Sequence, residues 1–230
     1  MKAAAIVAAA GAGLRMGNEI RKQYLEIAGV PVLVRSLQLF ASCPLVDEIA
    51  AVIPAGDQKA VALLIEPYFR PGEIILVEGG STRQESVARG LAALTGSADY
   101  ICIHDAARPM AGAALLLDLL NNVPGCGAVV PVIRPADTVK EVDNRGYITG
   151  TPCRDKLRLV QTPQVFRREL IEKAYKEAEK RGTIATDDAA LVEMIGVPVM
   201  TVPGEEGNFK ITTPQQLELA EWFLKEETGR

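Results

Sequence analysis

The sequence predicts one α/β domain over residues 1–230, with a mostly parallel, Rossmann-like sheet between two layers of helices. Short apolar runs alternate with segments of helical spacing along most of the chain, and the length suits a single full core. Polar and apolar residues alternate over 137–154, which adds a protruding β-hairpin arm. Because ligands bind beyond the carboxyl ends of the strands in such folds, the loops that follow the apolar runs are candidate binding loops.

Composition excludes several classes of protein. The formal net charge is −4 and no basic run occurs, which argues against a nucleic-acid partner. No apolar stretch is long enough for a membrane helix, and the first residues lack the layout of a signal peptide, so we expect a cytoplasmic protein with no membrane partner. The four cysteines form no C-x-x-C pair, and a single histidine cannot build a histidine metal site.

The first apolar run leads into a loop of small residues. Small side chains let backbone N–H groups close around an anion, so this loop is a candidate site for nucleotide phosphates. It matches neither the P-loop pattern nor the G-x-G-x-x-G fingerprint, and Arg15 and Lys22 would have to supply the positive charge. A tight turn with two solvated cations is the alternative. The loop residues are Ala9, Ala10, Gly11, Ala12 and Gly13.

Two βαβ units follow. Residues 31–40 have the spacing of a helix and 46–54 that of a buried strand; Asp57 then caps a helix that runs to residue 68, before a strand at 73–78.

A glycine turn after this strand opens a helix that begins near Ser81 or Thr82 and runs to residue 94. Glycine permits the close approach of a base or ribose, and two polar side chains of the helix lie a turn apart on one face. A structural N-cap and a solvated arginine are the alternative. The candidate nucleotide-binding residues here are Gly80, Ser81, Arg83 and Ser86.

The apolar run 99–105 places Asp105 at the carboxyl edge of the sheet, where a divalent cation that bridges nucleotide phosphates needs an oxygen ligand. Arg108 could grip a phosphate, ahead of a helix that starts after Pro109 and ends at residue 121. An Asp105 that caps this helix and pairs with Arg108 is an equally good interpretation. Strand alternation points His104 away from Asp105.

The remaining chain continues the α/β pattern around the arm. A strand at 127–133 precedes the hairpin, whose base carries Thr138, Lys140 and Arg154; the arm could contact a second subunit or lie free on the surface. The segments that follow are an extended piece at 158–164, helices at 167–181 and 186–195, the second capped by Thr186, a strand at 197–202 and a closing helix at 213–226. Lys210 lies in a strand-like run at 208–212, where it either faces the site or lies on a sheet edge.

The loop at 9–16, followed by Lys22, Gln23 and Tyr24, resembles that of glycosyltransferase-A-like nucleotidyltransferases, which have the nucleotide-diphospho-sugar transferase fold. Taken together, the motifs resemble the 2-C-methyl-D-erythritol 4-phosphate cytidylyltransferase family. The stretch 133–137, between the strand and the motif at 137–140, is longer than in the family pattern. This difference bears on where the arm begins. The matching segments are 9–16, 22–24, 79–86, 104–109, 137–140, 162–164, 186–187 and 208–212.

The resemblance implies a mixed sheet, a homodimer joined by the arm, and CTP with Mg²⁺ or another divalent cation as requirements. Arg15 and Lys22 would hold the triphosphate, Lys210 would join the reacting centre, and Asp105 would contact the metal or the substrate. No general base is needed, because the attacking phosphate oxygen is already anionic. The implied pocket for the polyol phosphate, shared between subunits, consists of Asp105, Ala106, Arg108, Thr138, Arg154, Thr162 and Thr186.

Two other functions fit the same motifs. A cytidylyltransferase for another polyol phosphate, such as ribitol 5-phosphate, would share the loop and the Asp105–Arg108 motif. A non-catalytic CTP-sensing domain is the alternative from a different class, although such a sensor could dispense with Arg15, Lys22 and Lys210.

Overall fold

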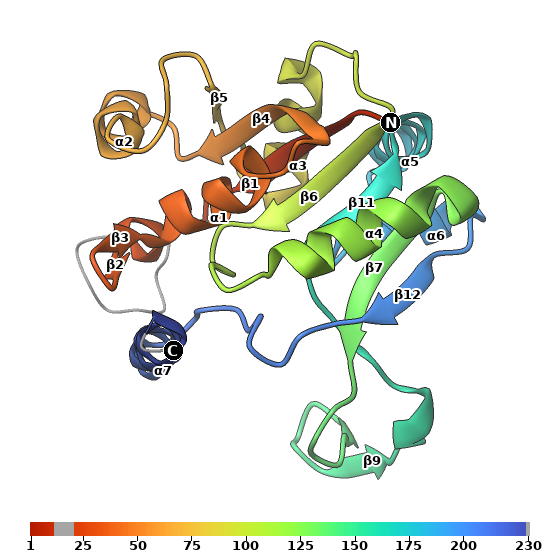
Figure 1. The fold of residues 1–230 in the computed structure, drawn as a ribbon. Helices are drawn as coiled ribbons and strands as arrows, with labels where there is room; N and C mark the ends of the chain where they lie inside the picture. The colour runs from red at the N-terminus through yellow and green to blue at the C-terminus, as the bar shows by residue number, and fades with distance from the viewer. Residues whose placement is uncertain (12–20, 229–230) are drawn as a thin grey trace.

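An eight-stranded sheet runs through the computed structural model, which describes residues 1–11 and 21–228 (Figure 1). Strand β1 (Ala3–Ala8) lies between β4 (Val46–Ile53) and β6 (Tyr100–Asp105) and is parallel to both. From β1 the chain builds outward through β4 to β5 (Ile74–Glu78), then returns to the opposite side of β1 as β6. The carboxyl ends of β1 and β6 meet at this reversal, which is where open α/β sheets bind ligands.

The other half of the sheet is mixed. Strand β11 (Gln164–Arg167) is inserted antiparallel between β6 and β7 (Ala128–Ile133). Strands β10 (Leu159–Val160) and β12 (Met200–Pro203) both pair with β7, β10 antiparallel and β12 parallel. The mostly parallel mixed sheet is therefore confirmed. The extended piece expected at 158–164 instead contains the edge strand β10 and leads into β11, a buried strand inside the sheet.

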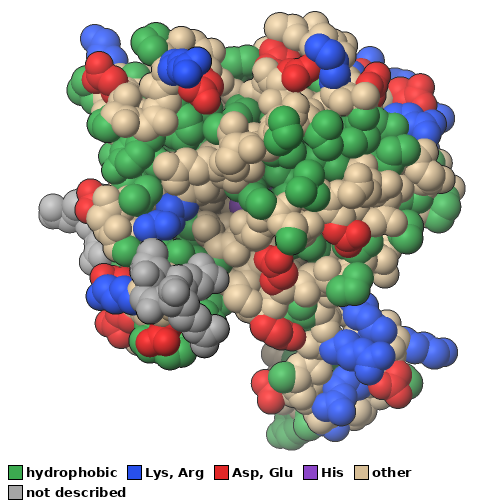
Figure 2. Space-filling view, viewed as in Figure 1, with side chains coloured by type: hydrophobic (Ala, Val, Ile, Leu, Met, Phe, Trp, Pro, Cys, Tyr) green, Lys and Arg blue, Asp and Glu red, His purple; other side chains and the backbone are tan. Residues whose placement is uncertain are grey.

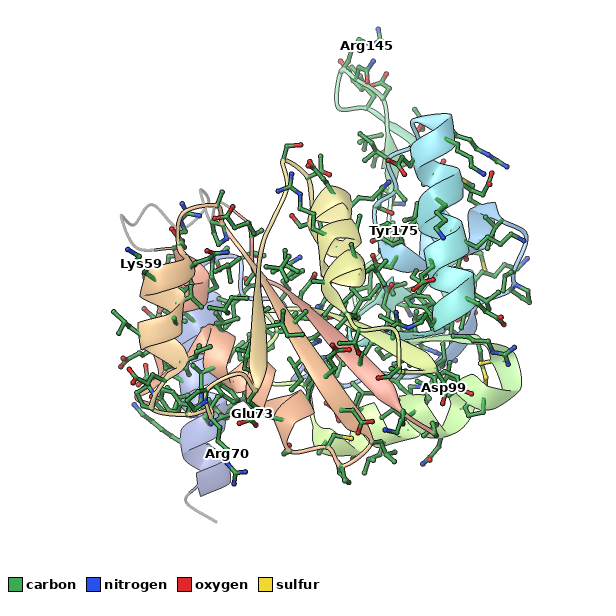
Figure 3. All side chains as sticks on the ribbon, turned by 90° about the horizontal axis from the view of Figure 1, so that it is seen from above. Lys59, Arg70, Glu73, Asp99, Arg145 and Tyr175 are labelled. Carbon is green, nitrogen blue, oxygen red and sulfur yellow. The ribbon has the colours of Figure 1, made fainter. Side chains whose placement is uncertain are left out.

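Helices cover both faces of the sheet (Figures 1 and 3). Alternate residues of β1 point to opposite faces: Ala5 and Val7 join one core cluster, and Ala4 and Ile6 join the other. The first cluster packs against α1 (Val32–Ala41), α2 (Gln58–Ile65) and α4 (Ala113–Cys126). The second packs against α3 (Arg83–Ala93), α5 (Arg168–Arg181) and α6 (Asp188–Met194).

The closing helix α7 (Pro214–Thr228) forms a smaller cluster at one side of the domain, where Ala220 packs with Ile27 and Val32. Ile27 ends β2 (Glu26–Ile27), which pairs antiparallel with β3 (Val30–Pro31), and Val32 follows β3. Among the described helices, none combines the length and hydropathy that crossing a membrane requires.

A side-chain cap marks the start of α3, but none marks the start of α2. The Thr82 side chain accepts a hydrogen bond from the Glu85 backbone N–H (3.0 Å), as expected for the cap of α3. Asp57 precedes α2, but its carboxylate accepts from the Tyr24 hydroxyl (2.8 Å) and does not cap the helix. That helix also ends at Ile65, three residues earlier than predicted.

Three other boundaries and one strand predicted from the sequence are wrong. Helix α4 begins at Ala113 rather than after Pro109, because the turn 106–110 intervenes and the Gly112 N–H donates to the Glu205 carboxylate (3.0 Å). Helix α6 is capped by Asp187, which accepts from the Ala190 N–H (3.0 Å), and not by Thr186. The strand predicted at 197–202 begins only at Met200, and the run 208–212 is not a strand.

The hairpin arm forms as predicted, with β8 (Glu141–Val142) paired to β9 (Ile148–Gly150). The Asp143 carboxylate closes its turn by accepting from the backbone N–H groups of Arg145 (2.9 Å) and Tyr147 (3.0 Å). The arm projects from the sheet, with Arg145 at its far end (Figures 1 and 3). Lysine and arginine side chains gather on and beside it (Figure 2).

Helix α3 approaches the sheet most closely at Gly90, where a Cβ would lie 2.7 Å from Ile6 Cγ2 and 3.0 Å from Val52 Cγ2. We expect Gly90→Ala to lower the free energy of unfolding in urea by roughly 1–3 kcal/mol, because the added methyl overpacks the core. The matched control is Gly125→Ala in α4, where a Cβ meets no atom within 4 Å. It should be neutral or slightly stabilising, and equal losses in both variants would contradict the packing argument.

Candidate active site

Three cationic side chains surround the carboxylate of Asp105 at the end of β6. Lys210 Nζ lies 2.7 Å from Asp105 Oδ2, Arg83 Nε lies 3.1 Å from Oδ1, and Arg108 Nε lies 3.9 Å from Oδ2. Burial by itself raises the pKa of this carboxyl, but Arg83 and Lys210 outweigh burial and hold the pKa well below its usual range. Asp105 is therefore ionised, and we call these four residues the Asp105 cluster.

Each member of the cluster comes from a different part of the fold. Arg83 is the first residue of α3, and Arg108 lies in the turn after β6. Lys210 belongs to an irregular segment that is held against this turn, because the Ile211 N–H donates to the Ala107 carbonyl (2.8 Å). Arg108 Nη1 donates to the Asn208 carbonyl (2.8 Å) at the other end of the segment. The Lys210 ammonium thus points into the site, as one of the two sequence interpretations requires.

Hydrogen bonds between uncharged groups fix the backbone at Asp105. Thr162 Oγ1 accepts from the Asp105 N–H (3.0 Å) and lies 3.0 Å from His104 Nδ1. His104 Nε2 lies 3.1 Å from the Arg108 carbonyl, which can only accept, so Nε2 carries the proton and Nδ1 accepts from the Thr162 hydroxyl. His104 is fully buried and both of its ring nitrogens are used in these hydrogen bonds, so the ring holds the turn after β6 in place.

The start of the predicted phosphate-binding loop lies beside the cluster, since Ala8 is paired in register with Asp105. The buried amide of Gln23 donates to the carbonyls of Ala9 (2.8 Å) and Gly11 (3.3 Å) and so fastens the loop. Lys22 begins the short 3-10 helix that carries Gln23, η2 (Lys22–Tyr24). The predicted positions of Ala12, Gly13 and Arg15, and of the Lys22 side chain, lie outside the described residues.

The turn at Gly79 and Gly80 packs directly against this loop, because a Cβ at Gly79 would collide with the Cβ of Ala10. Ser86 Oγ accepts from the Gly80 N–H (3.1 Å), and the backbone and hydroxyl of Ser81 both donate to Glu85 (2.8 Å each). Ser86 of α3 thus holds the turn at Gly80 and Ser81 next to the loop, and the contact of these residues with a base remains a prediction.

The residues predicted to bind the polyol phosphate do not all lie together. Ala106 and Thr162 adjoin Asp105, and Thr186 is exposed in the segment before α6. Thr138 and Arg154 belong to the arm, where Arg154 donates to the Ala136 carbonyl (3.1 Å). Neither of these two side chains forms a hydrogen bond or an ion pair with the Asp105 cluster of its own chain.

Comparison with known proteins identifies the family. The family model described as 2-C-methyl-D-erythritol 4-phosphate cytidylyltransferase matches residues 3–226. This chain belongs to that family. A 2-C-methyl-D-erythritol 4-phosphate cytidylyltransferase of Syntrophus aciditrophicus is 43% identical over 230 residues, which cover 100% of this chain and 98% of that protein. A relative of the same name from Symbiobacterium thermophilum is 44% identical and covers 96% of this chain and 92% of its own length.

Solved structures of the family share the fold. The 4-diphosphocytidyl-2C-methyl-D-erythritol synthase of Anaerococcus prevotii superposes with a TM-score of 0.85 at 34% identity, covering 97% of this chain and 98% of its own. The 2-C-methyl-D-erythritol 4-phosphate cytidylyltransferase of Thermus thermophilus gives 0.80 at 34% identity, with 98% and 100% covered. The predictions of the family, the fold class and a nucleotidyltransferase activity are therefore confirmed.

Several residues that shape this cytidylyltransferase-family site were not singled out from the sequence. Gln23 lies inside the motif 22–24, but the motif by itself does not reveal that the Gln23 amide fastens the loop. Asp188 begins α6, where an aspartate ordinarily does no more than favour the helix dipole, yet its carboxylate accepts from Arg83 Nη2 (2.7 Å). The signal for Asp188 is weak in the sequence, because an aspartate at a helix start is ordinarily a solvated cap.

Asp105 is also the predicted magnesium ligand. Within residues 1–11 and 21–228, no group of three or more His, Cys, Asp or Glu side chains could hold a metal ion. Each Asp105 oxygen accepts from one cationic side chain and keeps a further lone pair. Magnesium that takes most ligands from triphosphate oxygens and water needs only one or two protein carboxylates. The residues fit a cation that arrives with the nucleotide rather than one held by protein groups alone.

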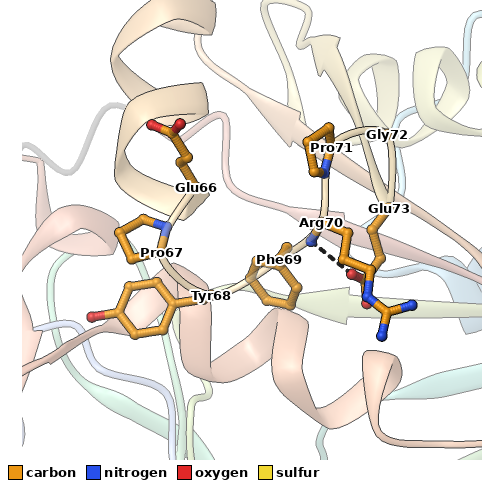
Figure 4. Close-up of a pocket in the computed structure, with 8 residues that line it drawn as sticks. All are labelled: Glu66, Pro67, Tyr68, Phe69, Arg70, Pro71, Gly72 and Glu73. Carbon is orange, nitrogen blue, oxygen red and sulfur yellow. Dashed lines mark hydrogen bonds between the residues drawn. The ribbon is translucent and has the colours of Figure 1, made fainter.

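A surface hollow of about 870 Å³ lies elsewhere, over the connection between α2 and β5 (Figure 4). It is lined by residues 66–73, where the Arg70 N–H donates to Glu73 Oε2 (2.9 Å). This connection precedes β5 and so lies at the amino end of a strand, whereas Asp105 ends its strand. The hollow therefore belongs to the opposite edge of the parallel strands and not to the candidate active site.

Burial of the His104 imidazole should make the free energy of unfolding depend on pH. Burial lowers the pKa of His104 to about 4 from an ordinary value of 6.5. The neutral ring thus stabilises the fold above pH 6.5, and this contribution is lost as the pH falls toward 4. With about 1.4 kcal/mol per pKa unit, roughly 3 kcal/mol of unfolding free energy should disappear across this range.

Because the chain has one histidine, its imidazole proton resonance can be followed directly by NMR. We expect half-protonation near pH 4, and His104→Gln should flatten the decline of unfolding free energy between pH 6.5 and 4. An imidazole that titrates near pH 6.5 would contradict the buried, neutral ring.

Proposed function

We propose that this protein transfers a cytidylyl group from CTP to 2-C-methyl-D-erythritol 4-phosphate and releases pyrophosphate, in non-mevalonate isoprenoid precursor biosynthesis. The Asp105 cluster is the observation that carries this proposal. In a chain of this family, it places three cations and one carboxylate at the carboxyl ends of β1 and β6, beside the small-residue loop. Two anionic substrates can meet only where such positive charge offsets their repulsion.

The reaction forms one phosphorus–oxygen bond and breaks another. An oxygen of the phosphate monoester attacks the α-phosphorus of CTP, and the bond to the β-phosphate breaks so that pyrophosphate leaves. The attacking oxygen is anionic near neutral pH, so the site needs no general base. The neutral His104, with both ring nitrogens in hydrogen bonds, accords with such a mechanism.

In this proposal, positively charged side chains provide most of the stabilisation of the transition state. Arg15 and Lys22 hold the triphosphate and offset charge that accumulates on the five-coordinate phosphorus, and Lys210 joins them at the reacting centre. Asp105 either accepts hydrogen bonds from the polyol hydroxyls or would supply an oxygen ligand to a bound Mg²⁺. Bound Mg²⁺ would further neutralise the triphosphate.

A homodimer joined by the arm is part of the proposal. Three apolar side chains of the arm are largely exposed: Val142 (61%), Tyr147 (68%) and Ile148 (63%). Leu159 on the edge strand β10 is 50% exposed. Exposed apolar residues on a projecting hairpin support contact with a second copy of the chain. In that arrangement Thr138 and Arg154 would complete the pocket of the partner subunit. The cytoplasmic location stays a prediction.

The direct test is pyrophosphate release by the purified protein with CTP, Mg²⁺ and 2-C-methyl-D-erythritol 4-phosphate, with ribitol 5-phosphate in parallel. We expect rapid release with methylerythritol phosphate alone. Release with ribitol phosphate would move the function to the other polyol, and CTP binding without release from either would favour a sensor.

The same assay tests the role of Lys22. Lys22→Ala should lower turnover by about a hundredfold or more, since loss of one transition-state charge costs at least a few kcal/mol. The control is Lys59→Ala, which removes an exposed lysine of α2 and should leave turnover unchanged. Turnover of Lys22→Ala within tenfold of the unmodified protein would refute the assignment.

Measurement of the oligomeric state tests whether the arm joins two subunits. Ile148→Asp places a charge on the proposed interface and should convert a dimer into monomers in sedimentation equilibrium, with loss of activity at the same concentration. Leu63→Asp changes an equally exposed apolar residue (70%) on α2 and should leave the mass unchanged. A monomeric unmodified protein that is fully active would exclude the dimer.

A further inference from the structure

Asp188 is the first residue of α6 and is fully buried. One carboxylate oxygen accepts from Arg83 Nη2 (2.7 Å) and the other from the Tyr175 hydroxyl (2.5 Å). Burial raises the pKa of Tyr175, and the neighbouring Asp188 raises it further, so the hydroxyl keeps its proton and remains a donor. Both oxygens of Asp188 therefore hold protonated partners.

Capping does not account for this residue. Asp187, one position earlier, already accepts from the first-turn amide of Ala190, whereas Asp188 points into the protein. A buried carboxylate has a large desolvation cost and often adds little net stability even when it is paired. Its presence is therefore better explained by what it orients than by the stability it supplies.

The group that Asp188 orients is Arg83. Arg83 uses Nε for Asp105 and Nη2 for Asp188, so its guanidinium lies between two carboxylates. About 30% of the Arg83 side chain remains exposed, which leaves it room to swing outward when one of these partners is removed. Through Arg83, a residue of α6 reaches the carboxylate at the end of β6.

A second residue, Gln84, also joins the start of α3 to the chain before α6. Gln84, next to Arg83, donates to the Thr183 carbonyl (3.0 Å) and accepts from the Ala185 N–H (3.0 Å). The start of α3 is thus bound at two points to the chain around Thr186, the exposed residue predicted to bind polyol phosphate. Arg83 faces this segment and Asp105 rather than the turn at Gly80.

We propose that Asp188 is a positioning residue for the transfer reaction: it fixes Arg83 against Asp105 and so holds the polyol-phosphate side of the site in its reactive arrangement. The inference rests on the proposed function, which it deepens by assigning Arg83 to the polyol phosphate instead of the cytosine. The proposed role of Asp188 does not involve the loop that binds the nucleotide phosphates. A substitution at Asp188 should therefore affect the kinetic constants for the polyol phosphate and those for CTP differently.

Asp188→Asn tests this assignment with little change in shape. The amide oxygen can accept from Arg83 and the amide nitrogen can donate to the Tyr175 oxygen, so that mainly the charge is lost. We expect kcat/KM for the polyol phosphate to fall by about tenfold or more, while KM for CTP stays within about twofold. The matched control is Glu193→Gln, which removes one negative charge from an exposed position of the same helix and should preserve kcat/KM.

A double-mutant cycle separates positioning from general damage. If Asp188 acts through Arg83, adding Asp188→Asn to an Arg83→Gln background should change kcat/KM by less than about twofold. Independent, multiplying losses would overturn the proposal. So would a lower melting temperature with unchanged kcat/KM, or a loss confined to KM for CTP.

A measurement that needs no turnover keeps the inference separate from the proposed function. In NMR, the Arg83 Nε–H should exchange slowly with solvent in the unmodified protein and in Glu193→Gln, and at least about tenfold faster in Asp188→Asn. An unmodified protein that does not turn over would refute the proposed reaction while this exchange rate still decides whether Asp188 fixes Arg83. Equal exchange in all three proteins would overturn the positioning role.

Discussion

The ionised carboxylate of Asp105 is the constraint on which the candidate site depends. A charge at this depth is tolerated only with partners, and its partners come from α3, from the turn after β6 and from the segment before α7. Two of these partners are in turn held by further bonds, Arg83 by Asp188 and Arg108 by the Asn208 carbonyl. The site is therefore assembled only when segments from the whole chain are in place.

Uncharged groups surround this charged centre and give it a fixed frame. The segment 161–164 supplies most of them: Thr162 binds the end of β6, Gln164 donates to Asp187 (2.9 Å), and Gln161 donates to the Glu205 carbonyl (2.8 Å). All three side chains are almost fully buried. Buried amides and hydroxyls that are hydrogen-bonded restrict the local backbone, which suits a site that must position its substrates.

Local patterns in the sequence were enough to predict β1, its small-residue loop, Asp105 at a strand end and the hairpin arm. Each of these depends on neighbours in sequence: apolar runs, glycines, and alternation around a turn. The pairings were not predictable, because Arg83 and Asp188 are 105 residues apart and a lone arginine is more often solvated. Strand β11 was missed as well, since four residues with a buried glutamine carry no clear period.

The antiparallel insertion of β11 also has a consequence for synthesis on the ribosome. Strands β1, β4, β5 and β6 are complete once residue 105 has been made, but the free edge of β6 pairs with residues 164–167. That edge must wait for roughly sixty further residues, or several seconds at 5–20 residues per second. During this interval the nascent chain exposes a row of unpaired backbone groups, which makes β6 the strand most in need of shielding from other nascent chains.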